Sequence, residues 1–560
     1  MSDPHGDRAP RSDPGEGAEA GPPSPSDPSR AELPPVELGD LDAAERVLAM
    51  AFDARRREHV PETLASHRRG IAAMRRLRFP NDLAPASVFD ARAAGAPLPP
   101  PRPPAPAGPG FGRSARSWDD LPFLTVAELA ATLRRGDLTS RGLTERYLAR
   151  IDRHDPVLRA VITPLADRAR AEAERADREL AAGIDRGPLH GVPYLAKDLL
   201  AVPEAPTTWG AAPFRDQRLE ATATVVARLE EAGAVLLGKA SLGALAMGDV
   251  WFDATTRNPW DLEQGSSGSS AGSASGVAAG LCTFAIGSET MGSILSPAER
   301  CSVVGLRPTF GRVSRHGAMA LSWSLDKVGP LTRSAEDAAL VLTQVAGVDP
   351  ADPATREAPF PWDPRLDPTS LRVRAPRGTL DDPSPAVAAC LDDLETLDVR
   401  VAPVDLPDLP TEPIMTLLMV EASAAFDELV RGEGIDALVR QTADAWPTLL
   451  RAARFVSAAD YVQAQRLQRR VRDEMAVLFE GTDLLLTSGT DATAMLFGNA
   501  AGAPVTTLPS GRGEGGRPAG NVSILGRPFF EHETLALAHA LQGRQGPLPV
   551  PPAFAPDAAG

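Results

Sequence analysis

The chain has 560 residues, of which 43% are hydrophobic, and a formal net charge of −16. This composition suits a globular protein with a large core, while the acidic balance argues against direct nucleic-acid or membrane-surface binding, because phosphates and anionic lipids attract dense Lys and Arg faces. Its 3 cysteines lack the spacing of a zinc site or a disulfide framework, and no apolar stretch could span a bilayer. We expect a cytoplasmic protein with no metal or other cofactor.

The N-terminal region divides into a tail and a helical segment. Residues 1–37 are rich in Pro, Ser, Gly and acidic residues, so we expect a disordered tail. From Asp40, a candidate N-cap, apolar residues recur at helical spacing, and Pro61 opens a second segment of the same kind. We predict a helical hairpin over residues 38–94. Its apolar face favours docking on this chain's own body or on a neighbouring one, which leaves a homodimer open.

A Pro-rich stretch separates this hairpin from the main body. Residues 95–116 include the run GAPLPPPRPPAPAGPG, which favours an extended polyproline conformation and hence a stiff linker. The main body then extends over residues 117–545. The Pro- and Ala-rich end, residues 546–560, is expected to form a second disordered tail.

Within the main body, short β-like apolar runs alternate with amphipathic helical segments. The expected strands lie at residues 191–195, 234–237, 282–286 and 484–486, and the expected helices include 222–232, 335–346, 459–478 and 532–542. Such alternation is typical of a layered α/β fold.

The densest chemical signal is a run of small residues, GSSGSSAGSASGVAAG, at positions 265–280. The run holds no Pro and no charge, and the apolar segment 281–286 follows it, so a solvated linker does not explain it. Gly and Ser in a buried loop let backbone amides approach a ligand closely and supply hydroxyls that can relay protons. This region is therefore the first candidate for a catalytic site.

Other motifs compete with this interpretation. Residues 268–272 fit the G-x-S-x-G nucleophile elbow, but polar residues precede them where that elbow needs a hydrophobic strand. Residues 324–327 fit S-x-x-K without its companion motifs, which favours chance. His190 and His316 could serve a Ser-His-Asp triad, although ordinary polar contacts are the better interpretation. We expect Trp209 and Trp323 to be packing residues.

Several motifs occur in the order typical of one family. They are GVPYLAKD at 191–198, RNPWD at 257–261, the Gly/Ser loop, GSETMGSILSP at 287–297, VGLRPT at 304–309, GRVS at 311–314, LDKVGP at 325–330 and NAAGAP at 499–504. From about residue 120 to 545 the chain thereby resembles the amidase-signature enzymes, which include bacterial amidases, fatty acid amide hydrolase and the A subunit of glutamyl-tRNA amidotransferase. The resemblance implies an α/β fold in which helices cover both faces of a large, mixed, twisted sheet.

The resemblance also implies a catalytic triad. Its nucleophile falls on Ser293, its bridging serine on Ser269 and its base on Lys197, with Gly268 and Ser270 in the supporting loop. It further implies a cis peptide at Ser269. In this mechanism an uncharged lysine accepts a proton from Ser269, which in turn takes the proton of the attacking serine and so leads to an acyl-enzyme. The adjacent Asp198 could be a structural counter-ion for the lysine.

In such enzymes, backbone N–H groups around the nucleophile stabilise the oxyanion. By resemblance these belong to Thr290, Met291, Gly292 and Ser293. The chain departs from the family here, because Met291 stands in place of Gly, Glu289 in place of Asp and Leu295 in place of Arg. We expect these departures to shift the substrate range, and the loss of the Arg to disfavour a carboxylate-bearing substrate.

The leading hypothesis is therefore a stand-alone amidase, without metal, that releases ammonia or an amine from a small-molecule carboxamide. The nearest alternative is the A subunit of a tRNA-dependent amidotransferase. That protein carries a tyrosine-rich stretch where this chain keeps only Tyr461, which disfavours it. A third hypothesis, supported only by Met291 and Leu295, is a catalytically silent scaffold of the same fold.

Overall fold

The computed structural model describes residues 35, 37–49, 60, 61, 64, 81–83, 87–115, 118–252, 254–410, 413–489 and 491–556. The chain divides into two compact units, Met1–Phe79 and Pro80–Gly560. Among the described residues, no helix is both long and apolar enough to cross a membrane.

In the first unit, the described residues centre on helix α1 (Leu38–Leu48). The N-cap is Glu37, and not Asp40 as the sequence suggested, because the Asp40 carboxylate lies one turn inside the helix and accepts the Glu37 backbone N–H at 2.9 Å. The tail over residues 1–37 lies almost wholly outside the described residues, and so do residues 61–80 of the second segment of the predicted hairpin.

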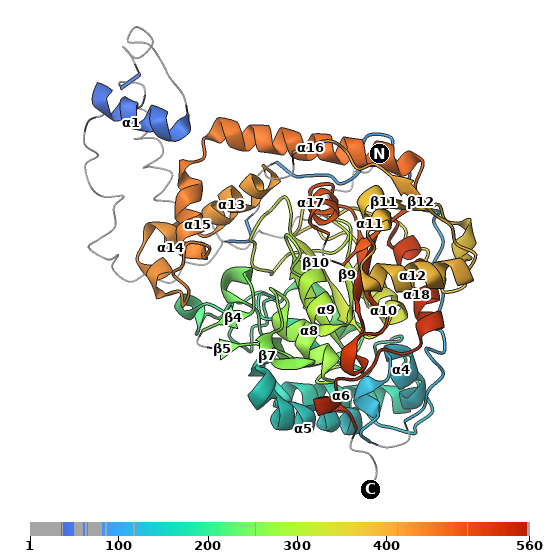
Figure 1. Ribbon diagram of the computed structural model, residues 1–560. Helices are drawn as coiled ribbons and strands as arrows, with labels where there is room; N and C mark the ends of the chain where they lie inside the picture. Colours follow the sequence, from blue (N-terminus) through green and yellow to red (C-terminus); the bar gives the residue numbers. More distant parts are fainter. Residues whose placement is uncertain are drawn as a thin grey trace, which may run out of the picture. The chain divides into compact units, whose positions relative to one another are not determined.

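The second unit is built on a mixed sheet of 11 strands with helices on both faces, which confirms the predicted fold class (Figure 1). In spatial order its strands are β1 (Val161–Pro164), β3 (Val235–Ala240), β2 (Pro193–Lys197), β8 (Phe284–Glu289), β10 (Lys327–Thr332), β9 (Val304–Arg307), β14 (Val505–Ser510), β15 (Gly520–Gly526), β13 (Leu484–Ser488), β11 (Val373–Pro376) and β12 (Val401–Val404). Parallel pairs β3–β2–β8 and β13–β11–β12 flank an antiparallel centre.

The helices form groups around this sheet. Helices α8 and α9 pack together, as do α10 and α18, while α5 and α6 pair near β3. The α-helices of this unit are α4 (Val126–Arg134), α5 (Ser140–Leu158), α6 (Ala166–Ala181), α7 (Thr224–Glu231), α8 (Ala271–Ala278), α9 (Leu295–Cys301), α10 (Ala335–Val345), α11 (Arg377–Asp381), α12 (Pro385–Thr396), α13 (Ile414–Ala425), α14 (Asp427–Arg431), α15 (Trp446–Ala452), α16 (Ala458–Glu480), α17 (Ala492–Ala500) and α18 (Glu531–Gln545).

The predicted elements coincide with observed ones to within a few residues. The four expected strands correspond to β2, β3, β8 and β13, and the four expected helices to α7, α10, α16 and α18. Apolar runs in these strands are buried throughout, as the interior of a helix-covered sheet requires.

The strand register brings three chain segments to one edge of the sheet. In the parallel pair β2–β8, Ala196 lies opposite Ile286, so Lys197 at the end of β2 adjoins the last residues of β8. In the antiparallel pair β8–β10, Lys327 lies opposite Glu289. Carboxyl ends of parallel strands are common places for ligand sites in α/β sheets.

Residues 81–83 and 87–115, which we call the N-terminal strap, hold no helix or strand and belong to the second unit. The ring of Phe89 packs edge-on against Phe310, with ring centroids 5.3 Å apart. Further along, the backbone N–H of Ala105 donates to the Trp362 carbonyl and that of Gly108 to the Glu336 carboxylate, each at 2.6 Å. Residues 87–94, which the sequence placed in the hairpin, are therefore non-helical and docked.

The C-terminal residues 546–556 also pack on this unit, in contrast to the disordered tail that their composition favoured. Leu548 and Phe554 are buried. Their carbonyl groups accept hydrogen bonds from two buried guanidinium groups, those of Arg333 and Arg150. Two apolar side chains and two ready-made donors thus hold a segment whose other residues are mostly Pro, Gly and Ala.

Candidate active site

Lys197 ends strand β2 with its side chain completely buried. Its Nζ lies 2.8 Å from Ser269 Oγ, 3.1 Å from Ser270 Oγ and 2.9 Å from Ser288 Oγ. Burial lowers the pKa of Lys197 to about 7, against the opposing charges of Asp326 and Glu289. A lysine surrounded by hydroxyls in this way can be uncharged near neutral pH and accept a proton.

The neighbouring Asp198 does not pair with Lys197. Its carboxylate forms a buried ion pair with Lys239 at 2.8 Å, and its second oxygen accepts from the backbone and side chain of Thr208. The counter-ion suggested by the sequence therefore belongs to a different lysine. This arrangement leaves Lys197 with hydroxyl partners.

The Gly/Ser loop approaches Lys197 through a sharp turn. The Gly268–Ser269 peptide is cis, as the resemblance implies. At Gly268 a Cβ would collide with the carbonyl oxygen of Gly248, so only glycine fits this position. Ser270 precedes α8, and its Oγ donates to the Ser288 carbonyl at 3.1 Å while accepting the Ser288 backbone N–H at 3.2 Å. The loop is thus bonded directly to β8.

Ser293 lies in the loop between β8 and α9, next to the cis peptide. The backbone N–H of Ser270 donates to the Ser293 carbonyl at 3.0 Å, which places the two predicted serines in adjoining loops. The positive φ of this loop, 84°, falls on Gly292 and not on Met291. A Cβ at Gly292 would also come within 2.9 Å of Met495 Sδ. Met291 therefore adds bulk without adding backbone strain.

Glu289, at the end of β8, holds the end of this loop through hydrogen bonds. One carboxylate oxygen accepts the backbone N–H groups of Ile294 and Leu295, at 2.9 and 3.0 Å. The other accepts from Arg307 at 2.8 Å and from Asn499 at 3.1 Å. Burial acts to raise the pKa of Glu289, but the charges of Arg307 and Lys327 outweigh it and lower this pKa to about 2. The sequence marked Glu289 only as a departure, yet it organises the loop.

Asp326, just before β10, and Lys327, the first residue of β10, hold the other side of the loop. The Thr290 hydroxyl donates to Asp326 at 2.6 Å, and Lys327 Nζ donates to Asn499 Oδ1 at 2.7 Å. Burial, and next the charge of Arg307, lower the pKa of Lys327. Sequence reasoning identified LDKVGP and NAAGAP as landmarks, but not the bond that joins them.

The side chains of the other two departures lie apart from the polar cluster. Leu295 is buried in an apolar group with Leu485, Val505 and Leu525. Met291 is half-buried and packs against two apolar clusters of the core. At position 295, where the resemblance leads us to expect an arginine, the chain therefore has a leucine that packs in the core.

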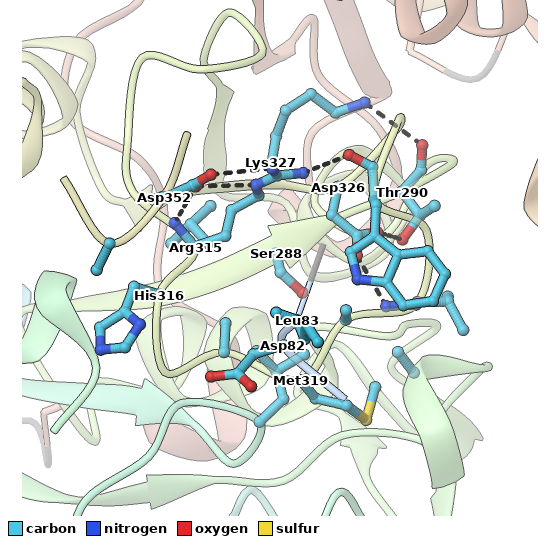
Figure 2. Close-up of a pocket in the computed structure, with 18 of the residues that line it drawn as sticks. Asp82, Leu83, Ser288, Thr290, Arg315, His316, Met319, Asp326, Lys327 and Asp352 are labelled. Carbon is cyan, nitrogen blue, oxygen red and sulfur yellow. Dashed lines mark hydrogen bonds and ion pairs between the residues drawn. The ribbon is translucent and has the colours of Figure 1, made fainter. Parts of the chain in front are cut away.

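A pocket with a cavity volume of about 170 Å³ adjoins this cluster at Ser288 and Thr290 (Figure 2). Its lining includes Asp326 and Lys327 and several apolar residues of the segment 318–323. Trp323, expected to be a packing residue, is part of this lining. Trp209, in contrast, packs against Phe214 and Phe426 as expected.

The competing motifs do not assemble into catalytic sites. Ser324 bonds to Glu421, whereas Lys327 bonds to Asn499, so the S-x-x-K match has no paired geometry. His190 accepts the Arg186 backbone N–H and lies 3.0 Å from Glu179, away from the serine cluster. His316 lines the pocket, and its backbone N–H donates to Ser314.

Comparison with known proteins adds a family match to this geometry. A family model described as Amidase matches residues 142–510. The chain is 35% identical to the A subunit of the glutamyl-tRNA(Gln) amidotransferase of Roseiflexus castenholzii over 471 residues, which span 75% of this chain and 95% of that protein. With the corresponding protein of Anaeromyxobacter dehalogenans the identity is 35% over 487 residues, 77% of this chain and 98% of that protein.

Solved structures agree with this match. The peptide amidase from Stenotrophomonas maltophilia is 33% identical, with a TM-score of 0.66 over 75% of this chain and 96% of that one. A chain from a vestigial protein complex that reveals the evolutionary origins of an s-triazine catabolic enzyme is 30% identical, with a TM-score of 0.70 over 76% of this chain and 99% of that one.

Proposed function

The chain belongs to the amidase family, and on this premise we propose that it hydrolyses a carboxamide C–N bond with Ser293 as the nucleophile, Ser269 as the bridging serine and Lys197 as the base. The observation that carries the proposal is the environment of Lys197. Its nitrogen lies 2.8 Å from Ser269 Oγ and close to two further hydroxyls, while the nearby carboxylate of Asp198 pairs with another lysine.

The reaction begins when uncharged Lys197 accepts the proton of Ser269, which takes the proton of Ser293 as that oxygen attacks the carbonyl carbon. The protons return by the same path to the leaving nitrogen, so that ammonia or an amine departs and an acyl-enzyme remains. Water then attacks the ester, with the lysine and bridging serine again accepting its proton. The carboxylic acid leaves and Ser293 is restored.

Developing negative charge on the carbonyl oxygen needs donors that are already in position. In the part of the chain that the structure describes, the backbone N–H groups of Met291, Gly292 and Ser293 have no protein acceptor, which leaves them for this role. The backbone N–H of Thr290 completes the proposed oxyanion hole. Glu289 supports the hole by fixing the two residues that follow Ser293.

A second candidate is the A subunit of a tRNA-dependent amidotransferase, in which the same cleavage would supply ammonia to a partner protein. The relatives with 35% identity carry that name, and they favour this candidate over a stand-alone amidase. The peptide amidase at 33% identity supports the stand-alone function. Both candidates use the chemistry proposed for Ser293.

A fluorophosphonate probe, which phosphonylates activated serines, tests the nucleophile. The native protein should be labelled at Ser293, located by peptide mass spectrometry, and Ser293→Ala should not be labelled. The matched control is Ser296→Ala, three positions further along the same loop and helix, which should label like the native protein. Absence of labelling with several probes of different size would support the silent scaffold instead.

Ammonia release separates the two amidase functions. The chain alone is assayed against a carboxamide panel that includes glutamine, and then after co-expression with the other amidotransferase subunits of its source. Turnover by the purified chain alone supports the stand-alone amidase. Glutamine turnover that requires stable co-purifying subunits and misacylated tRNA supports the amidotransferase function.

A further inference from the structure

Part of the pocket beside the proposed catalytic site comes from a distant piece of the chain. Asp82 and Leu83, in the N-terminal strap, line it together with Ser288 and Thr290. The strap lies outside residues 142–510, which match the family model. Figure 2 shows Asp82, Leu83 and Met319 across the pocket from Thr290 and Lys327. This wall is therefore an addition to the shared family core.

Asn81 holds Asp82 and Leu83 in place by hydrogen bonds to two other segments of the second unit. Its Oδ1 accepts the backbone N–H of Ala320 at 2.6 Å, and its Nδ2 donates to the Ala320 carbonyl at 3.1 Å and to the Ala425 carbonyl at 3.2 Å. One side-chain amide thus replaces a strand-like pair of backbone bonds, which requires a donor and an acceptor on the same group. Asn81 acts as a positioning residue for Asp82 and Leu83.

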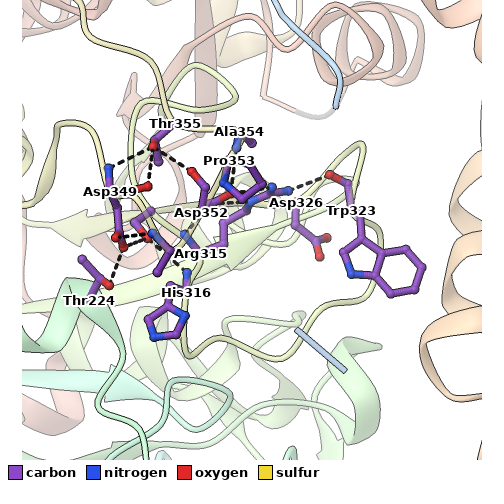
Figure 3. A network of polar contacts seen from close by, with 12 residues as sticks. Thr224, Arg315, His316, Trp323, Asp326, Asp349, Asp352, Pro353, Ala354 and Thr355 are labelled. Carbon is purple, nitrogen blue, oxygen red and sulfur yellow. Dashed lines mark hydrogen bonds and ion pairs between the residues drawn. The ribbon is translucent and has the colours of Figure 1, made fainter. Parts of the chain in front are cut away.

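Most charged groups in the pocket are already bonded to protein. Arg315 pairs with Asp352 at 3.1 Å and also donates to the Trp323 carbonyl (Figure 3). Asp326 accepts from Thr290, Leu321 and Ser322. These bonds satisfy each group, so none of them needs a substrate charge as a partner.

Asp82 differs from these groups. Among the described residues, its carboxylate has no hydrogen-bond or ion-pair partner, and it lies in an exposed residue at the pocket wall. The indole of Trp323 lines the same pocket, and an aromatic ring of this kind can attract a cation. An unpaired carboxylate and an aromatic ring together favour a positively charged group on the substrate.

We propose that the strap residues Asn81, Asp82 and Leu83 set substrate specificity by selecting compact carboxamides that carry an ammonium group, with Asp82 as its partner and Leu83 as the limit on bulk. This inference rests on the proposed amide hydrolysis at Ser293. It assigns to the strap a role in choosing the substrate and none in the proton transfers, because no hydrogen bond or ion pair joins its described residues to Lys197 or Ser269.

The test compares 3-aminopropanamide with its uncharged isostere butanamide. Each compound is used to protect Ser293 from fluorophosphonate labelling, and where turnover occurs kcat/KM is measured as well. The native protein should be protected by 3-aminopropanamide at about 2- to 5-fold lower concentration than by butanamide, as one exposed charge pair allows. Asp82→Asn should remove this difference and Asp82→Lys should reverse it. The matched control Asp381→Asn, at an exposed aspartate outside the pocket, should preserve it.

The other two strap residues give independent readouts. Leu83→Ala should increase kcat/KM or protection for phenylacetamide relative to butanamide. Asn81→Leu, which removes all three side-chain hydrogen bonds of Asn81, should reduce both selectivities. Equal protection by the charged and neutral amides in the native protein, or equal effects of Asp82→Asn on both, overturns the inference. Absence of Ser293 labelling overturns the proposed function first, so the two failures are distinguishable.

Discussion

Two buried regions meet at the loop that carries Ser293, and they treat charge in opposite ways. On one side, Lys197 is surrounded by the hydroxyls of Ser269, Ser270 and Ser288. On the other, Glu289 and Arg307 form a fully buried ion pair. The difference teaches that burial alone does not define a catalytic group. A buried lysine without an adjacent carboxylate partner can exchange a proton near neutral pH, whereas the compensated pair holds the backbone in place.

The largest effect is expected from Lys197→Ala, which removes the buried amine that has no carboxylate partner. Without the base, the fluorophosphonate labelling rate of Ser293 should fall by about 10³-fold or more. Cooperative thermal unfolding should persist, because the variant removes a costly buried amine. A labelling rate within about 3-fold of native would contradict the assignment of Lys197 as the base.

Glu289→Gln tests the buried ion pair, because it leaves the guanidinium of Arg307 without its counter-ion. We expect the free energy of unfolding to fall by about 3 to 5 kcal/mol, as when one partner of a buried pair is removed, and Ser293 labelling to weaken as the loop loosens. Urea unfolding measures the first effect and probe kinetics the second. Glu289→Asp, which retains a carboxylate, is the control and should lose less of both.

Asp198→Asn separates structural from catalytic charge next to Lys197. It breaks the buried pair with Lys239, so we expect stability to fall by about 3 kcal/mol. Because Asp198 is not the partner of Lys197, the labelling rate of the folded variant should stay within about 3-fold of native. A loss as large as that of Lys197→Ala would show that the reactivity of Lys197 depends on the Asp198–Lys239 pair.

The smallest expected effect is a shift of the pH profile of Ser293 labelling in the variant Ser288→Ala. Uncharged Lys197 is the reactive form, so the labelling rate should rise about tenfold per pH unit below its pKa of about 7 and level off above it. Ser288→Ala removes a hydroxyl that accepts a bond from the charged ammonium, which disfavours the charged form. The acid limb should therefore move to lower pH, by about one unit or less. Movement to higher pH would contradict this account of the cluster.

Sequence reasoning reached a large part of the fold because apolar periodicity is local. Strands β2 and β8 and helices α10 and α16 could be located from their own residues. The C-terminal segment could not, because the partners that hold Leu548 and Phe554 are arginines far away in the chain. Residues 61–80 of the predicted hairpin lie almost wholly outside the described residues and stay a prediction, as do the other proposed domain limits.

For the candidate site, the sequence by itself determined the residue types: Lys197 after an apolar run, and Ser269 and Ser293 within motifs that resemble one family. Only the tertiary structure decided their partners. It assigned Asp198 to Lys239, made Glu289 the support of the Ser293 loop, and brought Asp82 to the pocket wall. The physical reason is that hydrogen bonds and ion pairs depend on distances of about 3 Å between particular atoms, and only the folded chain fixes these distances.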